Sequence, residues 1–191
     1  MDGGQQAQTI EPQRPVLEIR QVQLRLLRIE DLIVVAKRVR DAGLVVGVST
    51  HMPDVVDTVE SKGWDVDYYM TCVYERHRSA EDLEKLLGQA PIPVGEVYLP
   101  LDPPRMFRVV RQTDKPCLAF KILAAGRLSE RREWVEEAFR QTFESIKSTD
   151  GVIVGIYDRY SDQPAENANL VRRYGGSMST SATANASRTD S

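Results

Sequence analysis

The stretch KPCLAFKILAAGRL, residues 115–128, decides the fold class of this chain. Its first half is typical of a buried β-strand, because side chains along residues 117–123 alternate between two faces. Lys121 falls on the face that carries small residues, and a lysine among apolar neighbours needs a carboxylate, an anion or a ligand as its partner. Residues 124–126 then predict a small-residue turn, and Ser129 is expected to cap the long amphipathic helix that follows.

The same pattern of apolar strand and amphipathic helix extends to both sides of this stretch. Three further strands are predicted at residues 44–49, 66–74 and 151–157, with a short edge strand at 96–99. Helices are predicted at residues 29–42, 53–63, 79–88, 102–113, 129–146 and 162–175. Parallel neighbours need crossover connections, so this alternation predicts an α/β fold with a parallel sheet. Four such units correspond to half of a (β/α)8 barrel.

Composition limits the possible partners and the compartment. The chain has 191 residues, 41% of them hydrophobic, which is enough for one domain with its own core. A net charge of -3 gives no basic surface for nucleic acid. The sequence shows neither a signal peptide nor an apolar run long enough to cross a bilayer, so we expect a soluble, cytoplasmic protein with Cys72 and Cys117 reduced in the core. The domain is expected to span residues 15–174, between disordered segments at 1–14 and 175–191.

Three strand ends together resemble the C-terminal half of the aldo-keto reductases: GVST at residues 47–50, FKILAAGRL at 120–128 and IVGIYDRYSDQPAEN at 153–167. The family has G-V-S-N, a leucine with glycines, and a glycine followed by a glutamate-asparagine pair at these places. The matching residues are Gly47, Val48, Ser49, Tyr74, Leu123, Gly126, Gly155, Glu166 and Asn167. On its sixth strand the family also has a glutamine followed by a tyrosine, and Tyr74 matches that tyrosine. Thr50 and Thr71 stand where the family has the asparagine and the glutamine.

The resemblance implies a TIM barrel that binds NADP and reduces a small carbonyl compound. Carried onto this sequence, the cofactor-binding residues are Ser49, Thr50, Gly126 and Asn167, and Tyr74 binds substrate. Tyr157, Asp158 and Arg159 end the last predicted strand, so we expect them to line the same mouth, with Arg159 binding the cofactor and Tyr157 and Asp158 binding the substrate. The family's catalytic aspartate, tyrosine, lysine and histidine come from the first half of the barrel, outside the region of resemblance. We therefore expect a homo-oligomer, or a partner that supplies the missing half.

Two residues are the candidates for catalysis. His51 follows a predicted strand, where barrel enzymes place functional groups, and it is either a base or a metal ligand; alternatively it caps the helix that starts at Pro53. Lys121 could form a Schiff base or bind a phosphate or carboxylate, or it could make a structural ion pair with Asp158 or Glu75.

No recognised ligand spacing joins His51 and Cys72 to the charged residues 75–78, so no metal is expected. Arg159 lies beside a predicted helix start, where an anion is favoured, although a surface pair with Asp162 is the alternative.

Three functions remain open at this point. The first is an NADP-dependent oxidoreductase of aldo-keto reductase type, which is incomplete and is not expected to be a competent reductase on its own. The second is a lysine-dependent lyase or isomerase that uses Lys121 with His51 on a carbonyl or sugar-like substrate. The third is a half barrel without catalysis, which self-associates through its open sheet edges.

Overall fold

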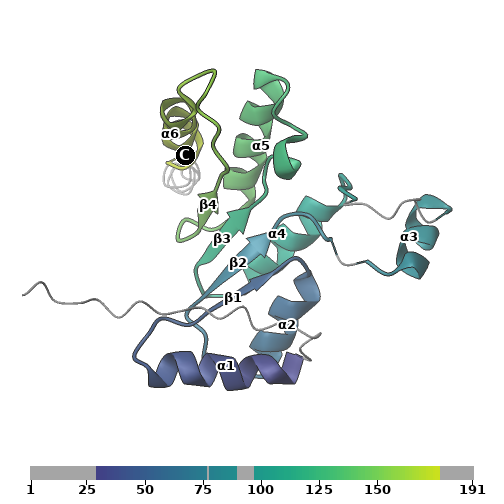
Figure 1. Ribbon diagram of the computed structural model, residues 1–191, viewed down its shortest axis with the longest axis vertical. Coiled ribbons are helices and arrows are strands. Elements are labelled where there is room, and N and C mark those ends of the chain that lie inside the picture. Colours follow the sequence, from purple (N-terminus) through teal and green to yellow (C-terminus); the bar gives the residue numbers. More distant parts are fainter. Residues whose placement is uncertain (1–28, 77, 90–96, 177–191) are drawn as a thin grey trace, which may run out of the picture.

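A computed structural model describes residues 29–76, 78–89 and 97–176 of the chain. Its centre is a four-stranded sheet in which every neighbouring pair is parallel and the spatial order follows the sequence (Figure 1). The strands are β1 (Gly47–Thr50), β2 (Tyr68–Cys72), β3 (Cys117–Phe120) and β4 (Gly151–Ile153). The α/β class and the parallel sheet are therefore confirmed.

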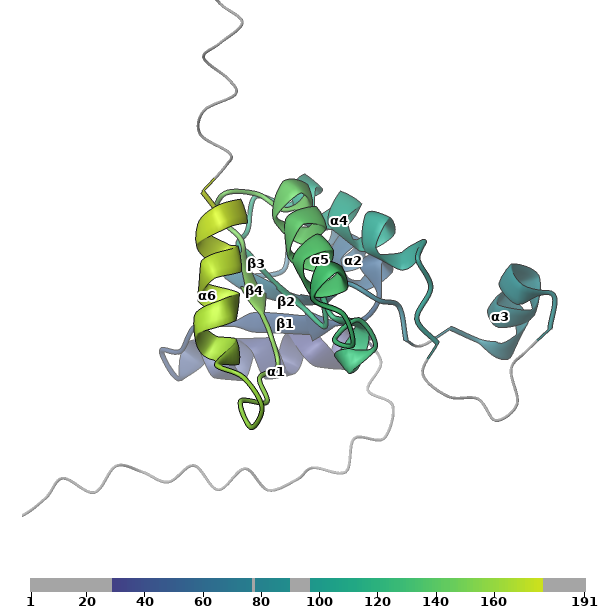
Figure 2. The same cartoon turned by 90° about the horizontal axis from the view of Figure 1, so that it is seen from above.

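Within the described residues, six α-helices alternate with the strands or extend the connections between them. They are α1 (Ile29–Asp41), α2 (Pro53–Ser61), α3 (Ala80–Leu87), α4 (Asp102–Gln112), α5 (Arg132–Ser145) and α6 (Gln163–Tyr174), and a 3₁₀ turn, η1 (Ala124–Gly126), follows β3. Helix α2 contacts α4, α4 contacts α5, and α5 contacts α6, so these four form a row. Helix α3 lies outside this row in both views (Figures 1 and 2).

Several helix ends follow directly from local sequence. Pro53 opens α2, where its missing N–H costs no helical hydrogen bond. Ser79 and Asp82 form a capping box at the start of α3, and Gly88 ends that helix with φ of 78°, a left-handed conformation that favours glycine. Asp162 caps α6 by accepting a hydrogen bond from the backbone N–H of Ala165.

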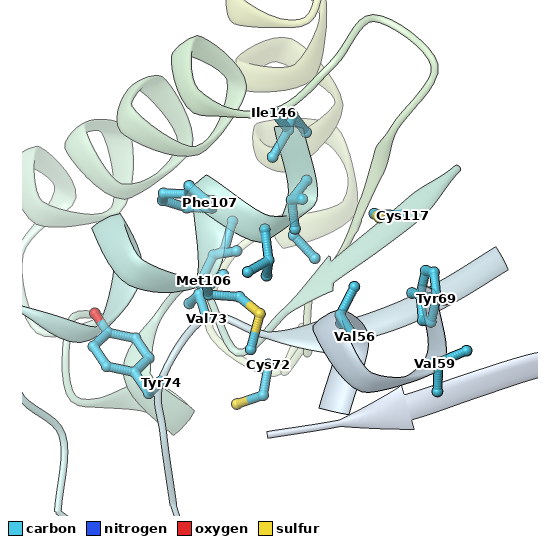
Figure 3. Packing of buried hydrophobic residues seen from close by; sticks show 14 of the residues in the cluster. Val56, Val59, Tyr69, Cys72, Val73, Tyr74, Met106, Phe107, Cys117 and Ile146 are labelled. Carbon is cyan, nitrogen blue, oxygen red and sulfur yellow. The ribbon is translucent and has the colours of Figure 1, made fainter. Parts of the chain in front are cut away.

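The hydrophobic core lies between the sheet and the helices. Figure 3 shows Val56 and Val59 of α2, and Met106 and Phe107 of α4, close to the buried residues of β2 and β3. Burying one such side chain contributes roughly 1.5–3 kcal/mol to stability. The core also includes Cys72 and Cys117, both free and fully buried, which confirms their interpretation as core thiols.

The strands are shorter than the sequence predicts. Strand β3 ends at Phe120, because Lys121 has φ of 60°, so the predicted strand through residue 123 is wrong. Strand β4 ends at Ile153 instead of 157, and β1 begins at Gly47 instead of 44. Two apolar residues that flank these strands, Val45 and Ile156, are exposed and outside the ladder, whereas Val46 is outside the ladder but buried in the core.

Two further local predictions are also corrected. Ser129 does not cap α5, which begins three residues later; Arg131 occupies the cap position and its side chain makes no capping hydrogen bond. Residues 97–99 form no strand, and residue 96 lies outside the described residues.

The predicted unstructured segment 1–14 and residues 177–191 of the predicted tail also lie outside the described part of the chain. Within the described part, no helix is both long and apolar enough to cross a membrane.

Candidate functional site at the carboxyl edge of the sheet

Three side chains with ionisable groups come from the carboxyl ends of neighbouring strands. His51 follows β1, Cys72 ends β2, and Lys121 follows β3. Cys72 is opposite Phe120 in the ladder, and the His51 ring contacts the Phe120 ring edge-on with centroids 5.4 Å apart. The predicted catalytic residues His51 and Lys121 therefore lie at the same edge of the sheet, where α/β proteins concentrate their ligand sites.

Lys121 lies close enough to Cys72 to affect its ionisation. Burial raises the pKa of the Cys72 thiol, while the charges of Lys121 and Arg76 act in the opposite direction and do not overcome burial. The Cys72 thiol is therefore protonated near neutral pH and is a core side chain, not a nucleophile.

The backbone after β3 is strained. Lys121, Ala124 and Ala125 all have left-handed φ angles, of 60°, 49° and 53°. A left-handed conformation costs a residue with a Cβ roughly 1–2 kcal/mol. Such strain persists where the surrounding structure enforces it, and it concentrates at ligand sites and switch regions. The turn at residues 121–126 is therefore the part of the carboxyl edge whose backbone favours a functional interpretation.

The structure places His51 one residue before the cap position of helix α2. Met52 occupies that position, and its side chain makes no capping hydrogen bond. The His51 Nε2 atom is shielded from solvent, and the His51 ring packs on Phe120.

The Thr50 hydroxyl makes two hydrogen bonds to the backbone of Met52. Its Oγ1 accepts a hydrogen bond from the N–H of Met52 at 2.9 Å and donates one to the Met52 carbonyl at 3.1 Å. This bonding fixes the turn between β1 and α2. Ser49 is exposed and lines a cavity of about 300 Å³ between α1 and β1.

A cluster of four charges lies beyond β2, and three of its side chains, those of Glu75, Arg78 and Asp102, are buried. The Glu75 side chain is 3% exposed and forms ion pairs with Arg78 at 3.2 Å and with Arg105 at 2.9 Å. Arg78 also pairs with Asp102, the fully buried first residue of α4. Burial raises the pKa of Glu75, and the two arginines offset this only in part. The cluster ties the segment after β2 to α4, and the Glu75 carboxylate is paired with two arginines.

The loop after β4 is exposed. The Tyr157 and Tyr160 rings meet edge-on at 5.8 Å, and the Arg159 guanidinium lies over the Tyr160 ring at 5.6 Å. The backbone N–H of Tyr157 donates to Gln163 Oε1 at 2.7 Å, which ties this loop to the start of α6. Among the described contacts none joins Tyr157, Asp158 or Arg159 to His51 or Lys121.

A cavity of about 410 Å³ opens between the loop after β4 and helices α5 and α6. The starts of both helices contribute to it: Ser129 and Arg132 on the α5 side, Gln163 and Asn167 on the α6 side. Within the described residues, the Arg132 guanidinium has no hydrogen bond or ion pair, and α5 has no side-chain cap. Helix starts carry partial positive charge and unsatisfied N–H groups, so this cavity suits an anionic group.

Of the five predicted cofactor-binding residues, only Asn167 lines this cavity, together with the motif residues Gly155 and Glu166. Tyr74, predicted to bind substrate, lines two other cavities beside α4 and α5. Sequence reasoning missed Arg132 and the Glu75 cluster. Arg132 lies in the first turn of a helix after a strand end, a signal that could have identified it.

The described residues contain no group of three or more His, Cys, Asp or Glu side chains positioned to hold a metal ion. No family model, curated protein or solved structure matches this chain.

Proposed function

We propose that this chain is the second half of an aldo-keto reductase-like barrel and binds NADP(H) in the cavity between α5 and α6. The observation that carries the proposal is this cavity of about 410 Å³, which opens at the carboxyl end of the last strand between two helix starts. In barrel enzymes the loops after the last two strands, with a helix N-terminus, frequently form a phosphate site.

The arrangement of the helices supports the barrel interpretation. All four strands are parallel and sequential, and the helices α2, α4, α5 and α6 each contact the next in a single row. A right-handed crossover repeated between adjacent strands places successive helices on one face. Four such units, closed by four more, give a (β/α)8 barrel.

The residues of the cavity fit the adenosine-phosphate part of the cofactor. Arg132 can form a bidentate pair with a phosphate, and the uncapped first turn of α5 offers backbone N–H groups. The amide of Asn167 matches the donor and acceptor edge of adenine, and the Glu166 carboxylate can accept from an amino or hydroxyl group. When bound, the cofactor supplies a hydride.

His51 and Lys121 lie at the same edge of the sheet and are the candidates to orient a small carbonyl substrate. The remaining four strands come from a second copy or from another chain, because the acid and base groups of the family belong to the other half of the barrel. Alone, the chain binds the cofactor without turning over a substrate.

The experiment is a fluorescence titration of NADPH with the full chain. Arg132→Gln is expected to weaken binding about tenfold or more, because one charge-assisted hydrogen bond is worth roughly 1.5–3 kcal/mol. Asn167→Ala is expected to weaken it less, since the lost bonds are neutral. The matched control is Arg108→Gln, an exposed arginine on α4 that lies outside the cavity and should leave the affinity unchanged.

If the folded chain shows no saturable binding of NADPH, this result contradicts the proposal. Equal weakening by Arg132→Gln and Arg108→Gln would also contradict it, because the attraction would then be a general effect of net charge.

A further inference from the structure

A second cavity, of about 770 Å³, lies on the other side of α5, against α4. Its walls come from the segment after β2, the segment before α4, helices α4 and α5, and the turn after β3. Its lining includes Tyr74, Tyr98, Phe107, Arg111 and Arg127. Small-molecule sites are usually concave and of this size, with apolar walls and a few placed polar groups.

The apolar part of the cavity is aromatic. The rings of Tyr74 and Tyr98 meet edge-on with centroids 5.1 Å apart, and Phe107 lines the same space. Pro103 and Pro104 of the first turn of α4 complete this wall. Flat, rigid walls of this kind favour a planar aromatic ligand, because ring contacts add to the energy of apolar burial.

The polar part of the cavity is cationic. The Arg127 guanidinium lies 4.2 Å from the centroid of the Tyr98 ring and donates one hydrogen bond, to the carbonyl of Ala124. Arg111 donates to the carbonyl of Ser145 at 3.0 Å. Both bonds are made to neutral carbonyls, so the two positive charges are not neutralised by them. The carboxylate in the lining, Glu144, is paired with Arg140 at 2.6 Å.

The Tyr74 hydroxyl supplies a hydrogen-bond donor. Figure 3 shows it at the end of the ring that points away from the packed core. It makes no hydrogen bond to the described residues, and Tyr74 lines the cavity. Burial raises the pKa of Tyr74, and the charge of Asp102 adds to this, so the hydroxyl stays protonated near neutral pH.

The strained turn after β3 belongs to this cavity. Ala124 lines it, and Ala125 and Gly126 continue the left-handed conformation up to Arg127. A strained backbone that holds an arginine over an aromatic ring is the kind of outlier that accompanies a ligand site.

We propose that this cavity binds a small aromatic anion, with its ring against Tyr74, Tyr98 and Phe107 and its carboxylate or sulfonate toward Arg127 and Arg111. The site is separate from the proposed NADP(H) cavity, because the two share no lining residue. It stands whether or not the chain binds a nucleotide.

The test uses 2-naphthoate as the probe and isothermal titration calorimetry on the full chain, with the neutral 2-naphthylmethanol as the matched compound. We expect saturable binding of 2-naphthoate and at least tenfold weaker binding of the alcohol. Arg127→Gln should remove most of this preference for the anion, and Tyr98→Ala should weaken both compounds. Arg108→Gln, on the same helix as Arg111 but outside the cavity, should change neither.

Three results would overturn the proposal. The first is the absence of saturable 2-naphthoate binding to the chain when circular dichroism shows that the chain is folded. The second is equal affinity for the anion and the alcohol, with no effect of Arg127→Gln. The third is that NADPH displaces 2-naphthoate and that Arg132→Gln abolishes 2-naphthoate binding. These two results together would place the probe in the cavity between α5 and α6.

Discussion

The two ends of the strands use polar residues in opposite ways. At the amino ends, carboxylates are saturated with hydrogen bonds: Glu60 Oε1 accepts from Tyr69, Thr113 and Lys115 at 2.6–3.0 Å. Asp150 just before β4 accepts from two backbone N–H groups and from the Lys147 ammonium.

The carboxyl ends instead hold strained backbone at residues 121–126, the cavity between α5 and α6, and the aromatic cavity beside α4. This division separates stability from function. At the amino ends, Glu60 Oε1 and both oxygens of Asp150 accept hydrogen bonds from within the protein. The carboxyl ends retain donors, positive charge and space. Barrel and open α/β proteins share this division, with stability at the amino face and chemistry at the carboxyl face.

The largest expected effect comes from Asp150, whose side chain is fully buried. Asp150→Ala removes the carboxylate partner of the Lys147 ammonium, which keeps its hydrogen bond to the Val110 carbonyl, and leaves the N–H groups of Lys147 and Cys117 without their acceptor. The chain should lose about 3–5 kcal/mol of stability. Urea unfolding should show a lower midpoint with an unchanged slope. Asp158→Ala, in an exposed position at the opposite edge, should change stability by no more than about 0.5 kcal/mol. Similar effects of the two substitutions would contradict the comparison.

A smaller and pH-dependent effect is expected at Glu60. Burial raises the pKa of this carboxyl, but the hydrogen bonds from Tyr69, Lys115 and Thr113 together outweigh it and lower the pKa below the ordinary value of 4.5. A lowered pKa stabilises the fold above the unfolded value, and this contribution is lost as pH falls through the folded pKa.

Glu60→Gln should therefore cost about 1–2 kcal/mol at pH 7, since a charge-assisted bond becomes a neutral one. The difference in unfolding free energy between the two proteins should shrink as pH falls from about 5 toward 3. A difference that stays constant through this range would mean that the Glu60 charge does not stabilise the amino edge.

The smallest effect, and one of opposite sign, is expected at the carboxyl edge. Ala125 is exposed and has φ of 53°, so Ala125→Gly relieves strain and should stabilise the chain by about 0.5–1 kcal/mol. Ala165→Gly, an exposed position inside α6, should destabilise it by a similar amount, about 0.5–1 kcal/mol. Thermal melting of both variants checks the pair, and a loss of stability in Ala125→Gly would show that the turn is not strained.

Local patterns in the sequence predicted the fold class and many helix boundaries, because caps and prolines act within a few residues. Ser79 with Asp82, Pro53 and Asp162 are examples. The end of β3 was not predictable, since nothing in the side-chain pattern marks Lys121 as left-handed. A lysine that continues the alternation suggests a longer strand.

The candidate site was predictable only in part. His51 was identified because it follows an apolar strand, and Lys121 because a lysine among apolar neighbours needs a partner. The parallel sheet brings the two strand ends to one edge. The pairing of Glu75 with Arg105, 30 residues apart, depends on how α4 packs beside β2. Arg132 faces Asn167 across a cavity that exists only when α5 and α6 pack together, and a local pattern contains no information on that contact.

The most direct test of this division is an amide NMR titration of the ¹⁵N-labelled chain with NADPH. The account predicts saturable shifts at Arg132, Gly155, Gln163 and Asn167, with little change at the amino-edge residues 60–67 and 113–116. Shifts centred on the amino edge, or none at all at millimolar NADPH, would contradict the assignment of ligand binding to the carboxyl edge.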